Sequence, residues 1–127
     1  PEKNQERFIS DSICFNAVRL GQRVNTQAII TMTFSGYTAY KISSQRPKAP
    51  IFVFTGNKKI LTQLNLVWGV TGFYYDKMVS TDHTITDIKY ILKKGGYLKD
   101  GDIVINIVSI PIEEKGKSNT IKLSYVE

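Results

Sequence analysis

"AIITMTFSGYTAYKISSQRPKAPIFVFTGN", residues 28–57, contains the pattern that decides the fold. A short apolar run ends at the turn residues Ser35-Gly36, an amphipathic stretch follows, and a second apolar run, "IFVFT", comes after the prolines. Short apolar runs bounded by turn residues are typical of buried strands. The residue before Pro47 is disfavoured in the helical region, so the helix between the two runs should end before that proline. The stretch therefore predicts a strand, a short helix and a second strand.

The flanking sequence continues this alternation. A first helix is expected to start at a cap on Ser10 or Asp11, because Ile13, Ala17, Leu20 and Val24 follow at helical spacing. Five further elements are expected, in this order: a helix after an Asn57 cap with Ile60, Leu61, Leu64 and Val67 or Trp68 on one face; a strand in "VTGFYYD"; a helix in "TITDIKYILKKGG" that stops at Gly95; and strands in "IVINIVSI" and "TIKLSYVE".

This order of elements indicates the fold class. Alternating strands and helices with nearly continuous apolar strands favour a parallel sheet that is covered by helices. The last two strands follow each other without a helix and should pair antiparallel. We expect an α/β fold, a three-layer domain with a mostly parallel five-stranded sheet, its last strand antiparallel and helices on both faces. Residues 1–127 are interpreted as a single domain, with residues 1–9 as a polar lead-in.

Composition narrows the class of protein. The 127 residues are 42% hydrophobic and 22% charged, which is ordinary for a globular domain. The apolar runs are too short to span a bilayer, and the polar start "PEKNQERFIS" is unlike a secretory signal. A single cysteine, Cys14, favours a reducing compartment, so a cytoplasmic location without a membrane partner is expected. Because the chain begins at Pro1 without a methionine, we expect a processed or excised piece of a longer protein.

Charge alone does not define a partner. Seventeen basic residues against eleven acidic ones give a net charge of +6, which favours anionic partners but also suits simple solubility. The basic residues are scattered, and no known nucleic-acid motif accompanies them. Four aromatic residues that could stack on bases are interpreted instead as core or sheet-face residues: Trp68, Tyr74, Tyr75 and Tyr90. An independent module that binds polyanions is the third hypothesis, and nucleic acid is not the expected partner.

The turn "TFSGYT", residues 33–38, has two interpretations. At the carboxyl end of a parallel strand, a helix N-terminus offers free amides to phosphate, and Gly36 lets the backbone approach the anion. Alternatively, Ser35 or Thr38 only caps the helix, which the residues alone favour because such capping is common. The loops "TGNKK" and "EEKGKSN" present the same choice between an anion site and an ordinary cap or hairpin loop.

The sequence contains no recognisable catalytic motif. His83 is the only histidine and is interpreted as solvated, while Cys14 is interpreted as a small packed residue of the first helix. Neither the dinucleotide-binding nor the P-loop glycine pattern occurs. The sequence therefore predicts no catalytic residue and no metal site in these 127 residues.

The ordered segments resemble the C-terminal domain of pyruvate kinases. The carrying motifs are T-x-S-G-x-[ST] after a strand, then R-P-x-A-P-I before the next strand, then "LVWGV", and finally "GYLKDGDIVINIVSIPIEEKGKSNTIKL". The resemblance is ordered, correctly spaced and extends from about Ser10 to the end. It implies the regulatory and assembly domain of an enzyme whose separate barrel transfers a phosphoryl group from phosphoenolpyruvate to ADP.

The resemblance also implies partners and a site. Mg²⁺ and K⁺ would serve the barrel and none would bind here, while the domain would bind a phosphorylated effector, contact the barrel and contribute to a homo-oligomer. The family's phosphate-binding turn and its closing loop map onto Thr33, Ser35, Gly36, Tyr37 and Thr38, and onto Lys115, Gly116, Lys117, Ser118 and Asn119.

Departures from the family pattern limit this site. Phe34 stands where members that respond to fructose 1,6-bisphosphate often have lysine, and Thr84 where they have a phosphate-binding arginine. Because ionised donors make the strong contacts to phosphate, both departures favour an effector with one phosphate. A scaffold domain with a decayed effector site is the alternative hypothesis.

Overall fold

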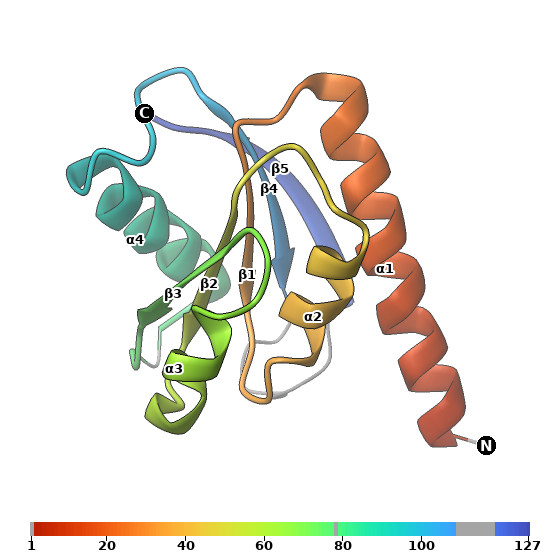
Figure 1. The fold of residues 1–127 in the computed structure, drawn as a ribbon. Helices are drawn as coiled ribbons and strands as arrows, with labels where there is room; N and C mark the ends of the chain where they lie inside the picture. Colours follow the sequence, from red (N-terminus) through yellow and green to blue (C-terminus); the bar gives the residue numbers. More distant parts are fainter. Residues whose placement is uncertain (1, 78, 109–118) are drawn as a thin grey trace.

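The computed structural model describes residues 2–77, 79–108 and 119–127, and it contains one five-stranded sheet (Figure 1). Its strand order is β3-β2-β1-β4-β5, with parallel pairing everywhere except between β4 and β5. The strands are β1 (Ala28–Met32), β2 (Ile51–Thr55), β3 (Val70–Tyr74), β4 (Ile103–Val108) and β5 (Thr120–Tyr125). The predicted α/β fold class is confirmed, including the antiparallel last strand.

Helices cover both faces of this sheet, as expected (Figure 1). They are α1 (Glu2–Val24), α2 (Tyr37–Ser44), the short 3₁₀ turn η1 (Lys58–Ile60), α3 (Leu61–Leu64) and α4 (Thr81–Lys94). Side chains of α1, α2 and α3 pack on one face against Ile29, Ile51 and Ile105, while α4 packs on the other against Ile30, Phe52 and Val104. Alternate residues of each buried strand thus contribute to two separate cores.

Helix α1 begins earlier than predicted. Instead of starting at Ser10 or Asp11 it already includes residues 2–9, so the expected polar lead-in is helical from Glu2 onward. The reason is composition: "EKNQER" consists mostly of residues with good helix propensity, and no glycine or proline interrupts it. Ser10 is buried inside the helix, and Asp11 bonds to another helix.

The helix after Asn57 is shorter than predicted. Asn57 does cap it, since its Oδ1 accepts a hydrogen bond from the Lys59 amide at 3.1 Å, but α3 ends at Leu64. The next residue, Asn65, donates its side-chain amide to the Leu61 carbonyl and accepts the Gly72 amide of β3 through Oδ1 at 2.9 Å. This side chain ends the helix and joins it to the edge strand.

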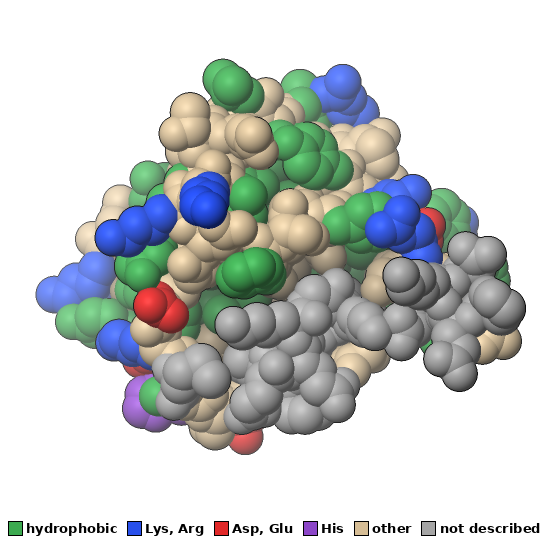
Figure 2. Space-filling view, turned by 90° about the horizontal axis from the view of Figure 1, so that it is seen from below, with side chains coloured by type: hydrophobic (Ala, Val, Ile, Leu, Met, Phe, Trp, Pro, Cys, Tyr) green, Lys and Arg blue, Asp and Glu red, His purple; other side chains and the backbone are tan. Residues whose placement is uncertain are grey.

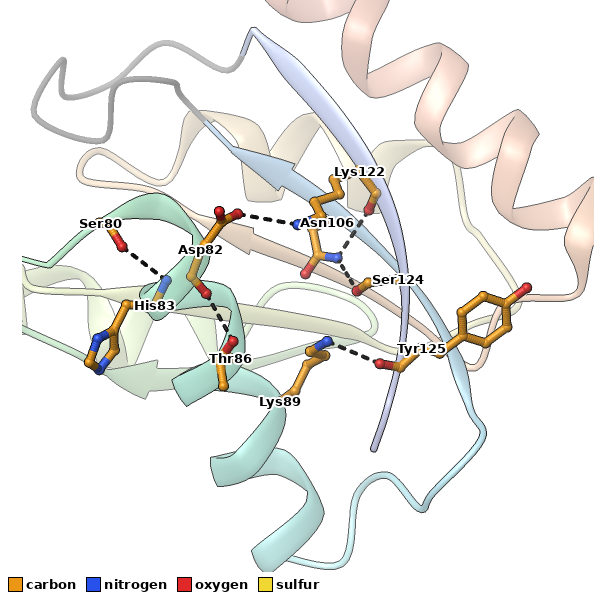
Figure 3. Close-up of polar contacts among 9 residues, drawn as sticks. All are labelled: Ser80, Asp82, His83, Thr86, Lys89, Asn106, Lys122, Ser124 and Tyr125. Carbon is orange, nitrogen blue, oxygen red and sulfur yellow. Dashed lines mark hydrogen bonds and ion pairs between the residues drawn. The ribbon is translucent and has the colours of Figure 1, made fainter.

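Polar contacts join β5 to α4 on one side and to β4 on the other (Figure 3). Asn106 of β4 is only 1% exposed and donates its amide to the Lys122 carbonyl at 3.0 Å and to the Ser124 hydroxyl at 2.9 Å. Lys89 of α4 reaches the Tyr125 carbonyl at 3.0 Å. These bonds hold the last strand beside a helix that does not cover it with apolar side chains.

Candidate functional site

The carboxyl ends of the parallel strands form the lower edge of the sheet in Figure 1. Residues 33–36 link β1 to α2 there, residues 56–57 link β2 to η1, and α4 begins at the same edge. Figure 2 looks onto this edge and shows lysine and arginine side chains on both sides of a mainly apolar and uncharged middle. In open α/β sheets this edge is the usual place for a ligand.

The turn after β1 is closed by its own hydroxyl groups. The Gly36 amide donates to Thr33 Oγ1 at 2.9 Å, and the Tyr37 amide donates to Ser35 Oγ at 3.3 Å. Gly36 has φ +91°, a left-handed conformation that glycine adopts readily and that residues with a Cβ atom rarely adopt. Two amides at the start of α2 therefore point to neutral oxygens of the same turn.

The predicted caps of α2 are wrong. Gly36 is the N-cap residue and has no side chain to bond with, while Thr38 is the second residue of the helix and is buried. Ser35 instead satisfies the amide of the first helical residue from one position before the cap. Because Gly36 supplies only conformation, the side-chain oxygens that accept the Gly36 and Tyr37 amides come from Thr33 and Ser35.

Asn57 joins the first two loops of this edge. Its Nδ2 donates to the Phe34 carbonyl at 3.0 Å, while its own amide donates to the Thr55 hydroxyl at 3.0 Å. The bond fixes the Phe34 backbone at the tip of the turn, and the Phe34 side chain is 48% exposed. Sequence reasoning identified Asn57 as a helix cap but missed this cross-link, because residues 34 and 57 come together only when β1 and β2 pair.

The Tyr37 side chain extends to α1 and not into the turn. Its phenol donates to Asp11 Oδ1 at 2.6 Å, and the Arg7 guanidinium lies 4.5 Å from its ring centre. Partial burial and this bond to the Asp11 carboxylate raise the pKa of the Tyr37 phenol. The sequence predicts Tyr37 as a phosphate-binding residue. In this structure its backbone amide lies in the turn, whereas its phenol bonds to Asp11.

Cations lie beside the turn but not within it. Lys58 and Lys59 follow the Asn57 cap, and both are exposed. The Lys58 ammonium lies 4.8 Å from the Tyr74 ring centre. Tyr74 is exposed but belongs to β3, and Tyr75 is buried, so both fit the prediction of a core or sheet-face residue. Trp68 and Tyr90 are exposed and lie outside the strands, which contradicts that prediction.

A second polar cluster lies at the start of α4. The Ser80 hydroxyl caps this helix by accepting the His83 amide at 3.2 Å. The Tyr75 phenol donates to Asp87 Oδ2 at 2.8 Å. Burial is the larger cause and this bond the smaller one that together raise the pKa of Tyr75 to about 12. The Thr84 hydroxyl lowers the pKa of Tyr75, yet within the part of the chain that the structure describes, Oγ1 of Thr84 is buried without a hydrogen-bond partner of good geometry.

Part of the predicted site falls outside the described residues. Lys115, Gly116, Lys117 and Ser118 lie there, so the closing loop has no description. Asn119 is described: its amide donates to the Val108 carbonyl at 3.1 Å, and its Oδ1 accepts the Thr120 hydroxyl at 2.6 Å. Asn119 thus starts the pairing of β5 with β4.

Other candidate chemistry is limited. Within residues 2–77, 79–108 and 119–127, no three His, Cys, Asp or Glu side chains group together as metal ligands. His83 is exposed as predicted and pairs with Asp87 at 3.5 Å. Cys14 is buried as predicted, and burial, with Asp11 nearby, raises the pKa of its thiol to about 11. In the described part of the chain, no helix is long and apolar enough to cross a membrane.

Comparison with known families gives a match over most of the chain. The family described as "Pyruvate kinase, alpha/beta domain" matches residues 11–124. The resemblance noted from the sequence motifs is therefore confirmed, and it covers the turn after β1 as well as both final strands.

Curated relatives agree with this family. A pyruvate kinase of Lactobacillus delbrueckii subsp. bulgaricus is 36% identical over 118 residues, covering 93% of this chain and 20% of the relative. A pyruvate kinase of Clostridium acetobutylicum is 33% identical over 124 residues, covering 98% of this chain and 26% of the relative. The chain thus spans about a fifth to a quarter of the length of these relatives.

Solved structures agree on the fold. A crystal structure of a pyruvate kinase from Cryptosporidium parvum superposes with a TM-score of 0.83 at 24% identity, covering 94% of this chain and 23% of that one. At this identity the likeness supports the arrangement of helices and strands and no finer property.

Proposed function

The chain belongs to the pyruvate kinase alpha/beta domain family, and on this premise we propose that it serves as the regulatory and assembly domain of a pyruvate kinase. The full enzyme would transfer a phosphoryl group from phosphoenolpyruvate to ADP in glycolysis, in the cytoplasm. That chemistry, with Mg²⁺ and K⁺, would belong to a catalytic barrel that these 127 residues do not contain. The domain itself would not be catalytic.

We propose that the domain binds a phosphorylated effector at the Thr33–Thr38 turn. The observation that carries this proposal is the start of α2, where the Gly36 and Tyr37 amides donate to neutral hydroxyls of the described residues. A phosphate oxygen carries charge and accepts more strongly than a hydroxyl. Phosphate would replace the Thr33 and Ser35 oxygens at these amides, and the released hydroxyls would then donate to it.

The charge around the turn supports an effector with one phosphate. Phe34 places an exposed ring at the tip of the turn, where it supplies no positive charge. Lys58 and Lys59 lie on the neighbouring loop, and Asn57 joins that loop to the turn. One dianionic group beside two exposed lysines is balanced, whereas a second phosphate would need further cations.

Calorimetric titration tests this proposal. The 127-residue chain is titrated with glucose 6-phosphate, ribose 5-phosphate, AMP and fructose 1,6-bisphosphate, and at least one of the first three should bind more tightly than the bisphosphate. Ser35→Ala and Thr38→Val should each weaken that binding by about tenfold or more, since each removes a donor to a charged acceptor. Thr62→Val, an exposed threonine of α3, is the matched control. No binding by any compound would contradict the effector proposal.

A scaffold role is the second candidate, and exposed apolar side chains favour it. Phe8 is 72% exposed, Ile9 50% and Phe15 51%, all on α1. Isolated apolar residues on a surface are ordinary, but three on one helix are consistent with a contact surface. Light scattering across a range of concentrations tests self-association: oligomers that dissociate in Phe8→Glu, together with silence in the titrations, would favour the scaffold.

A general polyanion-binding module has less support. Four lysine side chains at the surface are engaged with acidic groups on the protein: Lys41 with Asp11, Lys77 with Asp87, Lys93 with Asp100 and Lys122 with Asp82. Binding of this kind should fall steeply with salt and ignore the identity of the anion. Equal affinity for heparin and for single-stranded DNA, lost at high salt, would favour this role over the effector site.

A further inference from the structure

Asp11 is the carboxylate that joins α1 to the start of α2. Its Oδ1 accepts the Tyr37 phenol at 2.6 Å, and its Oδ2 lies 3.4 Å from the Lys41 ammonium. Arg7, one turn earlier on α1, places its guanidinium over the Tyr37 ring. Three charged side chains from two helices therefore meet around one tyrosine, and the bond to Asp11 is charge-assisted.

Tyr37 belongs both to the Thr33–Thr38 turn and to the contact between α2 and α1. Its amide is one of the two that close the candidate turn, through Ser35, while its phenol anchors the same residue to α1. A displacement of the Tyr37 backbone would therefore be transmitted to Asp11, and a displacement of α1 would be transmitted to the turn. This shared residue is a physical connection between the turn and a helix that begins 35 residues upstream of it.

The N-terminal part of α1 depends on such contacts. With 23 residues, α1 is about 34 Å long, whereas the five residues of β1 span only about 17 Å. The helix accordingly extends past the lower edge of the sheet in Figure 1. Phe8 and Ile9 on this part are exposed. The Asp11 cluster is where α1 bonds to α2, just before the buried apolar residues of α1 begin at Cys14.

We propose that Asp11 is a positioning residue for the Thr33–Thr38 turn, and that through Tyr37 the occupancy of the turn is coupled to the packing of α1. The ligand part of this inference rests on the proposed function. Coupling of this kind is reciprocal. A ligand that orders the turn also stabilises the packing of α1, and loss of the Asp11 contact lowers the affinity of the turn for that ligand by the same factor.

Cys14 provides a built-in reporter for α1. It is the only cysteine of the chain, is 1% exposed, and lies one turn after Asp11 in the core that α1 and α2 share. Its reaction with an aromatic disulfide reagent therefore requires α1 to open, and the rate measures how often it opens. The same reaction in denaturant gives the intrinsic rate of each variant.

Tyr37→Phe is the decisive variant, because it removes the hydrogen bond but retains the ring and Asp11. Labelling of Cys14 should become about fivefold faster, as expected for the loss of one such bond. Tyr40→Phe is the matched control: Tyr40 is on the same helix, 49% exposed, and should label like the unchanged protein. Asp11→Asn is a supporting variant only, since Asp11 itself raises the pKa of the thiol. Equal rates in Tyr37→Phe and the unchanged protein would overturn the inference.

A second arm uses inorganic phosphate against potassium chloride of equal ionic strength. Phosphate should slow Cys14 labelling in the unchanged protein and in Tyr40→Phe, and its calorimetric affinity should fall about fivefold in Tyr37→Phe. Unchanged phosphate affinity in Tyr37→Phe would overturn the positioning role, whatever the labelling shows. If phosphate and the four effectors all fail to bind the unchanged protein, the proposed function fails, and the labelling comparison alone decides whether Asp11 holds α1.

Discussion

On one face of the sheet, α1, α2 and α3 pack against aliphatic side chains, whereas on the other face α4 is the only described helix and packs against a surface rich in aromatic rings. The first core contains Ile29, Ile51, Val53, Ile105 and Ile107. The second contains Phe52, Phe54 and Tyr75, with Phe73 packed at its margin. The same five strands thus carry two cores of different chemistry.

The width of the sheet compared with that of a helix explains why the two cores differ. Five strands about 4.8 Å apart make a surface about 19 Å across, while one helix is about 10 Å wide. Three helices can cover the first face, but α4 leaves two flanks of the second. On the β3 flank the rings of Phe52, Phe73 and Tyr97 pack edge to face at 5.3–6.1 Å, and on the β5 flank polar contacts replace apolar packing (Figure 3). A face covered by a single helix therefore depends more on rings and on specific polar bonds.

The largest expected effect tests the aromatic core. Phe54 is fully buried and its ring stacks on Phe73 at 4.8 Å. Phe54→Ala should lower the free energy of unfolding by about 4 kcal/mol, through lost burial and the cavity that remains. Urea denaturation measures this change. Phe34→Ala, the same substitution at an exposed ring, should stay within about 0.5 kcal/mol; a loss below about 1.5 kcal/mol in Phe54→Ala would show that the rings are not central to this face.

The polar flank is tested at Asn106. Asn106→Leu should lower the free energy of unfolding by about 1–3 kcal/mol, because the buried amide loses its bonds to β5 and leaves their acceptors unpaired. Ser124→Ala removes one of the two bonds and should cost less. Both are measured by urea denaturation at neutral pH. A stabilised Asn106→Leu protein would mean that apolar packing could have closed this flank equally well.

Tyr75 makes the same face sensitive to alkaline pH. The phenol has a raised pKa of about 12 in the folded protein against 10 in the unfolded chain, so its contribution is complete below pH 10 and is lost as pH rises toward 12. The unchanged protein should lose on the order of 2 kcal/mol more than Tyr75→Phe across this range. Thermal unfolding at a series of pH values measures the difference, and parallel curves for the two proteins would contradict the assignment.

The smallest effect concerns Thr84, whose buried hydroxyl has no hydrogen-bond partner among the described residues. Thr84→Val keeps the shape of the side chain and removes the unsatisfied group, so it should raise the free energy of unfolding by about 1 kcal/mol. For a domain of this size the midpoint of thermal unfolding should rise by about 3–5 °C. A destabilised variant would reveal that the hydroxyl has a partner after all.

Much of the fold was predictable from local patterns. The apolar runs at residues 28–32, 51–55 and 103–108 are strands. Pro47 follows the end of α2, and α4 ends with two lysines before its Gly95 cap, as predicted. The errors lie where a pattern was interpreted without its surroundings. Ser10 and Asp11 suit a helix start, but the residues before them are good helix formers and α1 begins at Glu2. The helix after Asn57 is shorter than its apolar pattern predicts, because Asn65 bonds across to β3.

The candidate site was less predictable. Hydroxyls and a glycine after a strand indicated the Thr33–Thr38 turn, but the sequence does not show that Asn57 holds the Phe34 backbone or that the Tyr37 phenol bonds to Asp11. These pairs are 23 and 26 residues apart. No local periodicity connects them, because their contact depends on which strands and helices become neighbours.

The sequence by itself determined the order and type of the main elements and the family, since short-range periodicity, turn residues and ordered motifs are encoded along the chain. Only the tertiary structure decided which hydroxyls satisfy which amides, which aromatic rings are buried, and which helix the turn is tied to. The physical reason is that hydrogen bonds and burial act between neighbours in space, and in a sheet with crossover helices those neighbours lie tens of residues apart.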